Sequence, residues 1–264
     1  MKKPHVLISE TTCIDHLRKI RSLGWGRMFC QRAITPFEGE LHGFDNGAFL
    51  DWRAGSAFNE KRFISKYKEA QRFHAPYIAV TPDLVARGSE SLAHSIAWRG
   101  RLNNWPWYLA VQDGMTVEGV RDALPLFSGI FLGGTDKFKL GAFKWCELAH
   151  SEGKPFHYAR AGTITKLRHA IKIGADSIDS SFPLWTHARF DRFSAQWNYE
   201  EQQNELAFLE LERREDVRLR AGGARYRVMH RLLGREGLPQ GNLLAICGLH
   251  RSNDHMVTAA RRLS

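Results

Sequence analysis

The sequence predicts an α/β protein, a (β/α)8 TIM-type barrel followed by a basic helical extension. Two observations support this fold class. Eight short apolar runs recur through the first 180 residues, and helix-like segments separate most of them. Strands that alternate with helices form parallel sheets, and eight such units close into a barrel. We therefore expect a barrel over residues 1–195 and a C-terminal extension over residues 196–264 that packs on it.

The eight apolar runs have the length of buried strands. In chain order, the predicted strands are 5–9, 27–30, 41–49, 77–80, 107–111, 129–133, 155–159 and 176–179.

Helices are predicted between most of these strands, with the clearest patterns at 59–73, 142–153 and 163–174. The last of them begins at a threonine and ends at a glycine. Threonine is a good N-terminal cap, and glycine commonly ends a helix.

The chain changes character after about residue 196. Residues 198–223 have the composition of one long charged helix, and residues 213–235 hold eight arginines. Unpaired arginines along a helix attract phosphates. The alternative is a solvated helix that packs on the barrel through its leucines and phenylalanine. The arginines proposed to contact nucleic acid are Arg213, Arg214, Arg218, Arg220, Arg225 and Arg227, together with Arg160 of the barrel.

The charge of the 264-residue chain favours a polyanionic partner, because its formal net charge is +10. Simple solubility is the alternative explanation. Four cysteines without a C-x-x-C pair fit a reduced, cytoplasmic setting. The N-terminal apolar run is too short for a signal peptide, and no run approaches the roughly 20 residues of a membrane helix. We expect no membrane partner, and the oligomeric state stays open.

Polar residues follow the predicted strands, where TIM barrels place their active sites. Three of them are the carboxylates Asp45, Asp83 and Asp179. Each aspartate alone is more often a turn former or a helix cap, but their joint occurrence on one rim is more specific. The other residues of this predicted rim are Asn46, Gly47, Gln112, Asp113, Gly133, Gly134 and Arg160.

Two neighbouring carboxylates suit covalent chemistry at a sugar carbon, where one attacks and the other handles protons. Asp83 and Gln112 could recognise the edge of a nucleobase. The glycines at 133 and 134 have no Cβ, so their backbone can approach a flat ring. Within the last strand, alternation places Asp176 and Asp179 on opposite faces. We therefore expect Asp179 to have a catalytic role and Asp176 to have a structural role.

The five segments FDNGAF, VTPDL, AVQDG, FLGGT and SIDSS stand in this order at the strand ends. Together they resemble the queuine/archaeosine tRNA-guanine transglycosylase superfamily, over roughly residues 40–185. The resemblance implies a modified (β/α)8 barrel with Asp179 as nucleophile and Asp45 as second catalytic acid. It also implies a base-binding group, which consists of Asp83, Gln112, Gly133 and Gly134, with Asn46 and Gly47 beside them.

The chain departs from the tRNA enzymes of that superfamily in several ways. Their C-x-C-x-x-C zinc run is missing after Asp179, and Ala48 replaces a motif glycine. The residues Cys247, His250 and His255 fall short of the four ligands of a structural zinc site, so we expect no metal and no cofactor. No archaeal RNA-binding appendage is evident, and the chain is short.

These departures resemble the phage and bacterial branch that inserts 7-deazaguanines into DNA. The resemblance thus implies a DNA-guanine transglycosylase, a pentosyltransferase with DNA and a 7-deazaguanine such as preQ0 as partners. The alternatives are the same exchange on tRNA, a non-catalytic nucleic-acid-binding barrel, and a small-molecule TIM-barrel enzyme. A phage-encoded member would work in the host cytoplasm.

Overall fold

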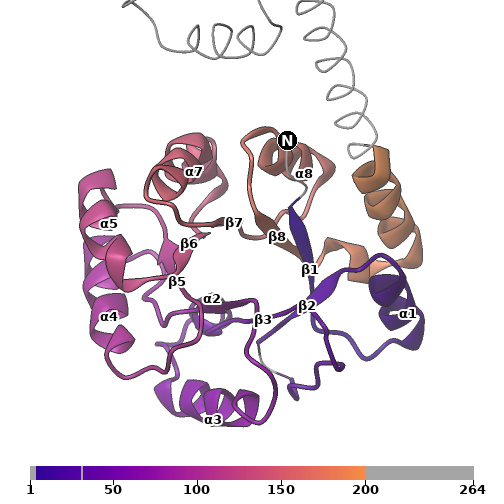
Figure 1. Ribbon diagram of the computed structural model, residues 1–264, viewed down its shortest axis with the longest axis horizontal. Coiled ribbons are helices and arrows are strands. Elements are labelled where there is room, and N and C mark those ends of the chain that lie inside the picture. Colours follow the sequence, from indigo (N-terminus) through magenta and orange to yellow (C-terminus); the bar gives the residue numbers. More distant parts are fainter. Residues whose placement is uncertain (1–3, 31, 200–264) are drawn as a thin grey trace, which may run out of the picture. The chain divides into compact units, whose positions relative to one another are not determined.

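Eight parallel strands form a closed barrel, in which each strand pairs with the next and β8 pairs with β1 (Figure 1). The computed structural model describes residues 4–30 and 32–199. The strands are β1 (His5–Ser9), β2 (Gly26–Phe29), β3 (His42–Phe44), β4 (Ile78–Val80), β5 (Trp107–Val111), β6 (Gly129–Leu132), β7 (Phe156–Tyr158) and β8 (Ser177–Ser180). The prediction of a TIM-type α/β barrel is confirmed.

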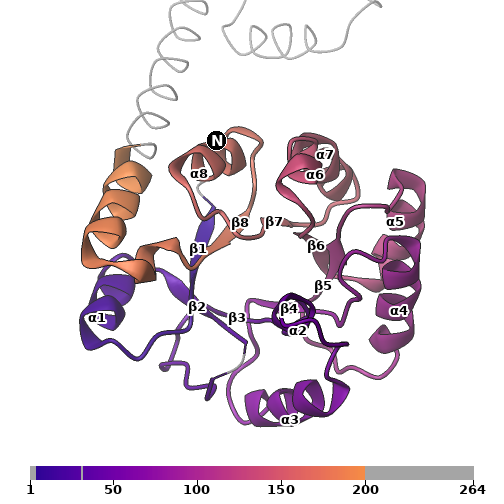
Figure 2. The same cartoon turned by 180° about the vertical axis from the view of Figure 1, so that it is seen from behind.

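Helices surround the barrel on its outside, except that α2 lies over the end of the barrel at β3 and β4 (Figures 1 and 2). They are α1 (Ile14–Ser22), α2 (Ala48–Arg53), α3 (Glu60–Ala70), α4 (Ser89–Arg99), α5 (Val117–Ala123), α6 (Asp136–Lys139), α7 (Ala142–Ser151) and α8 (Ile164–Lys172), with short 3-10 helices η1 (Leu124–Leu126) and η2 (Phe182–Trp185). A further helix at 187–199 follows η2, and its rings pack on the barrel, as Trp197 does against Trp25 at 6.2 Å.

The predicted boundaries agree closely with the structure except at the third strand. The prediction of a strand over 41–49 was too long, because β3 ends at Phe44 and α2 begins at Ala48. Gly47 lies between them with φ of +77°, a left-handed conformation that suits the turn into a helix. The capping prediction for α8 is confirmed, because the side chain of Thr163 accepts a hydrogen bond from Lys166 N.

Glycines make room for the large side chains that fill the barrel. Leu7, Met28 and Tyr108 belong to one buried cluster. A Cβ on Gly43 would lie 2.6 Å from Met28 Sδ, and a Cβ on Gly129 would lie 2.6 Å from the Tyr108 ring. Since real side chains do not approach that closely, these two strands need glycine where their neighbours carry bulk.

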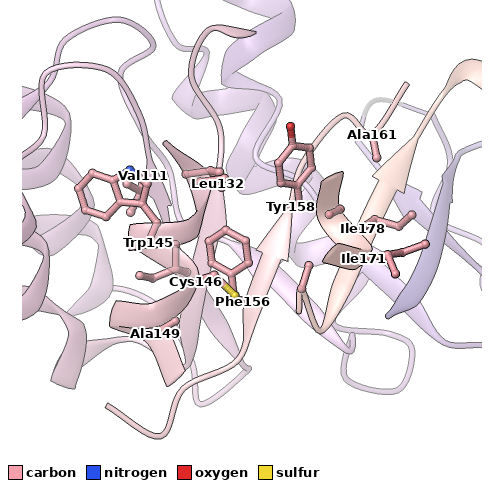
Figure 3. Packing of buried hydrophobic residues seen from close by; sticks show 14 of the residues in the cluster. Val111, Leu132, Trp145, Cys146, Ala149, Phe156, Tyr158, Ala161, Ile171 and Ile178 are labelled. Carbon is pink, nitrogen blue, oxygen red and sulfur yellow. The ribbon is translucent and has the colours of Figure 1, made fainter. Parts of the chain in front are cut away.

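The larger core lies between the strands and the outer helices. Figure 3 shows Trp145 of α7 and Phe156 of β7 within it, near Val111 of β5 and Leu132 of β6. Trp145 and Phe156 are completely buried. Burying a large apolar side chain contributes on the order of 2–3 kcal/mol, so this layer holds the strands in register below the polar rim.

A buried ion pair organises the connection from β2 to β3, where residues 30 and 32–41 contain no helix. Arg27 and Glu40 form two hydrogen bonds of 2.7 Å, and both side chains are only 4% exposed. Arg27 also donates to Thr35 O, and its guanidinium lies 4.5 Å from the centre of the Phe37 ring.

We expect Arg27→Met to lower the free energy of unfolding by about 3–5 kcal/mol, because it leaves the Glu40 carboxylate buried without its partner. The double variant Arg27→Met/Glu40→Leu should recover most of this loss. Urea unfolding followed by circular dichroism measures both. As a control, Asp15→Asn removes an exposed pair with Arg18 and should cost less than about 1 kcal/mol. Equal losses in all three variants would contradict the prediction.

Two groups of predictions fall outside the described residues. They concern the helical extension from residue 200 onward, with its arginines, and the possible ligands Cys247, His250 and His255. Within 4–30 and 32–199, no helix has both the length and the apolar character needed to cross a membrane. In that same part of the chain, no three His, Cys, Asp or Glu side chains cluster as metal ligands would.

Candidate active site

Asp179 lies on β8 near the carboxyl-terminal face of the barrel. Its Oδ1 atom accepts a hydrogen bond from Arg160 N at 2.9 Å and lies 3.0 Å from His157 Nε2. Burial, the largest influence, raises the pKa of Asp179, but these two donors outweigh it and hold the pKa below its usual value. No described residue donates a hydrogen bond to Oδ2. Asp179 therefore has one anchored oxygen and one oxygen available for chemistry.

His157 of β7 completes this arrangement and was not among the residues predicted from the sequence. The ring is fully buried and stacks on Phe131, with 4.7 Å between centroids. Burial lowers its pKa, so the imidazole is neutral. An ionised Asp179 can only accept, so Nε2 carries the proton, and Nδ1 accepts from the Ser177 hydroxyl at 2.8 Å. A histidine between two apolar strand residues carries no local signal of this role.

Asp176 takes the structural role expected for it. Its Oδ2 atom accepts from Phe156 N at 2.9 Å and contacts His150 Nε2 at 2.9 Å. Asp176 thus ties the start of β8 to β7 and α7, whereas Asp179 points into the site. The alternation along the strand separates the two carboxylates as predicted.

Asp45 follows β3, is partly buried and lies close enough to Asp179 for their charges to interact. Its Oδ1 atom accepts from Gly47 N at 2.8 Å, which fixes the turn into α2. Burial is the main reason that the pKa of Asp45 rises to about 6, and the charges of Asp179 and Glu10 raise it further. The structure therefore gives the two predicted catalytic carboxylates opposite pKa shifts.

Asp83, Asn46 and Gln112 form one buried hydrogen-bond network. Asn46 Nδ2 donates to Asp83 Oδ1 at 2.8 Å, and Gln112 Nε2 donates to Asp83 Oδ2 at 3.0 Å. Burial above all raises the pKa of Asp83 to about 7. Gln112 Oε1 accepts from Ala86 N at 2.5 Å. Gln112 thus supports Asp83 and the neighbouring turn, and its contact with a base stays a prediction.

The two predicted glycines have different roles. Gly133 N donates to Val111 O at 2.8 Å, so its amide continues the β-ladder. Gly134 has φ of +75°, and a Cβ there would lie 2.7 Å from Asp113 Oδ2. The carbonyl of Gly134 accepts a hydrogen bond from the Arg160 guanidinium. Their contact with a flat ring stays a prediction.

Two cations lie at the same end of the barrel. Arg160 is one of the two described non-glycine residues with positive φ, at 53°, and its guanidinium lies 4.3 Å from the centre of the Phe49 ring. Lys139 of α6 is 2% exposed and donates to Ala159 O. Burial, helped by the charge of Arg160, lowers the pKa of Lys139 to about 7. Lys139 was not predicted from the sequence, because a lysine in a short charged segment resembles an ordinary surface residue.

No protein-family model matches the chain, and no curated protein sequence matches it.

Proposed function

We propose that the protein is a DNA-guanine transglycosylase that exchanges guanine for a 7-deazaguanine base. The observation that carries this proposal is that Asp179 is anchored through Oδ1 alone, while the nearby Asp45 carboxyl interacts with its charge. The opposite directions of the two pKa shifts support it. Neighbouring carboxyl groups whose pKa values are driven apart are typical of a nucleophile beside an acid–base catalyst. The pKa of Asp179 is lowered, so its carboxyl group is ionised. The pKa of Asp45 is about 6, so this group can gain and lose a proton near neutral pH.

The reaction then runs in two displacements at C1′ of the sugar. Asp179 Oδ2 attacks C1′, the C1′–N9 bond breaks, and Asp45 gives its proton to the departing guanine. The incoming 7-deazaguanine loses its N9 proton to Asp45, and N9 attacks C1′ and releases Asp179. Two inversions restore the original anomer. The target guanine must first leave the base stack, because stacking blocks the reacting carbon.

The Asp83 network is the proposed reader of the base edge. A carboxyl group with a pKa of about 7 can present either a donor or an acceptor to the ring. Asn46 and Gln112 fix the orientation of the Asp83 carboxyl group. Base binding therefore costs little side-chain entropy at this group.

Incubation with radiolabelled guanine tests this proposal. Label that enters duplex or single-stranded DNA, and does not enter with Asp179→Asn, supports it. Label that enters tRNA alone supports the tRNA alternative instead. Nucleic-acid binding without any incorporation would favour a non-catalytic barrel, and neither binding nor incorporation would favour a small-molecule enzyme.

We expect His157→Phe to lower the exchange rate at the acid end of the pH–rate profile further than the titration of Asp45 alone does. The variant removes the donor to Asp179 Oδ1, so the pKa of the nucleophile rises and more of it is protonated at low pH. Exchange rates between pH 4 and 8 measure this effect. His150→Phe is the matched control, because it removes the comparable contact to Asp176, the residue before β8. An identical effect in both variants would contradict the prediction.

A further inference from the structure

Two tryptophans are exposed on the carboxyl-terminal side of the barrel. Trp52 of α2 is 51% exposed, and Trp185 at the end of η2 is 65% exposed. α2 follows β3 and η2 follows β8, so both lie where the parallel strands end. Figure 2 shows this side, with α2 in front of β3 and β4. Large exposed apolar groups on one functional face commonly mark a binding surface.

Each tryptophan is paired with a phenylalanine, and each pair carries an arginine. The Phe49 and Trp52 rings stack with centroids 5.9 Å apart, and Arg160 lies over Phe49. The Phe182 and Trp185 centroids are 6.1 Å apart. Arg189 lies 4.7 Å from the centre of the Trp185 ring. We call these four rings and two arginines the aromatic strip.

The loop after β7 lies between the two pairs and connects them to the site. Arg160 reaches Phe49 with its guanidinium, while its backbone N–H binds Asp179 Oδ1. Two residues further on, a Cβ added to Gly162 would lie 4.0 Å from Phe182 Cβ. The strip therefore passes beside the proposed nucleophile.

The chemistry of the strip fits a flexible polyanion with flat rings. Among the described residues, neither Arg160 nor Arg189 takes part in an ion pair, so both can meet phosphates. The nearby Lys166, by contrast, is paired with Asp136 at 2.7 Å. Aromatic rings interleaved with cations are the usual surface for single-stranded nucleic acid, because bases stack on the rings. A duplex offers phosphates but keeps its base faces covered.

We propose that the aromatic strip binds single-stranded DNA, with unpaired bases beside the reacting nucleotide stacked on Trp52 and Trp185. The choice of DNA rests on the proposed function, whereas the preference for unpaired bases rests on the strip. Arg160 and Arg189 would hold the phosphates of the same strand. The proposal makes an opened strand, and not an intact duplex, the bound form of the substrate.

Fluorescence anisotropy with a labelled oligonucleotide, single-stranded or annealed, tests the strip on the full chain. Trp52→Leu and Trp185→Leu keep an apolar side chain but remove the flat face. Each should weaken single-strand binding at least about fivefold and leave duplex binding unchanged. Phe73→Leu is the matched control, because Phe73 is 38% exposed and precedes β4, at the opposite end of the barrel. Residues 200–264 are identical in all variants, so any contribution they make to the affinity for the oligonucleotide cancels when variants are compared.

The strip is rejected if both tryptophan variants bind the single strand as the parent does, or if duplex affinity falls equally. The guanine-exchange assay distinguishes failure of the strip proposal from failure of the proposed function. Tryptophan-dependent binding without exchange on any nucleic acid would overturn the proposed function and keep the strip. Base exchange together with binding that does not depend on the tryptophans would overturn the strip and keep the proposed function.

Discussion

Asp179→Asn should abolish base exchange and leave the barrel folded. An amide oxygen is a poor nucleophile, so the covalent step is lost. Removing a nucleophile of this kind lowers kcat by about 10⁴-fold or more. The fold should persist, because the asparagine Oδ1 can still accept from Arg160 N and from His157 Nε2. Labelled-guanine exchange measures the loss, and thermal unfolding checks the fold.

The control for this result is Asp136→Asn on the same side of the barrel. Asp136 begins α6 and pairs with Lys166, and its side chain is 75% exposed. Its substitution removes one negative charge without touching the site, so exchange should stay within about twofold of the parent, as expected for a surface change. If Asp179→Asn exchanges at a rate close to that of Asp136→Asn, Asp179 is not the nucleophile.

Asp45→Asn should lower exchange by about 10²–10⁴-fold, the usual worth of a positioned acid–base group. Its pH profile should change as well. In the parent, guanine departure needs protonated Asp45 and entry of the new base needs the carboxylate, so the rate should peak near the pKa of about 6. The variant cannot titrate, so its residual rate should be flat across that range.

The free energy of unfolding of Asp45→Asn should rise at neutral pH, although its exchange rate falls. The folded pKa of Asp45, about 6, exceeds its ordinary value of 3.8. Its contribution to stability is therefore full at pH below about 4 and is lost as pH rises through about 6. Asparagine stays neutral and can still accept from Gly47 N. At pH 7.5 we expect Asp45→Asn to gain up to about 3 kcal/mol. Urea unfolding at pH 4 and 7.5 measures this, and equal values for parent and variant at both pH values would contradict it.

Local sequence patterns were enough to predict the barrel. Each strand is a short apolar run, and hydrophobic periodicity is a property of neighbouring residues that needs no knowledge of distant contacts. The same local rule separated Asp176, the residue before β8, from Asp179 within it. The third strand was predicted too long, because FDNGAF is apolar enough to continue a strand and only the turn at Gly47 ends it.

Tertiary structure decided what each polar residue does. His157 meets Asp179 only because β7 and β8 pair in the register that places His157 opposite Ser177. Asp83 accepts hydrogen bonds from Asn46 and Gln112, which are 37 and 29 positions away from it in the chain. Lys139 has its low pKa because folding buries it. Hydrogen bonds and desolvation depend on contacts between distant segments, so the sequence by itself determined the barrel and its polar rim, and the closed barrel determined the partner and pKa of each rim residue.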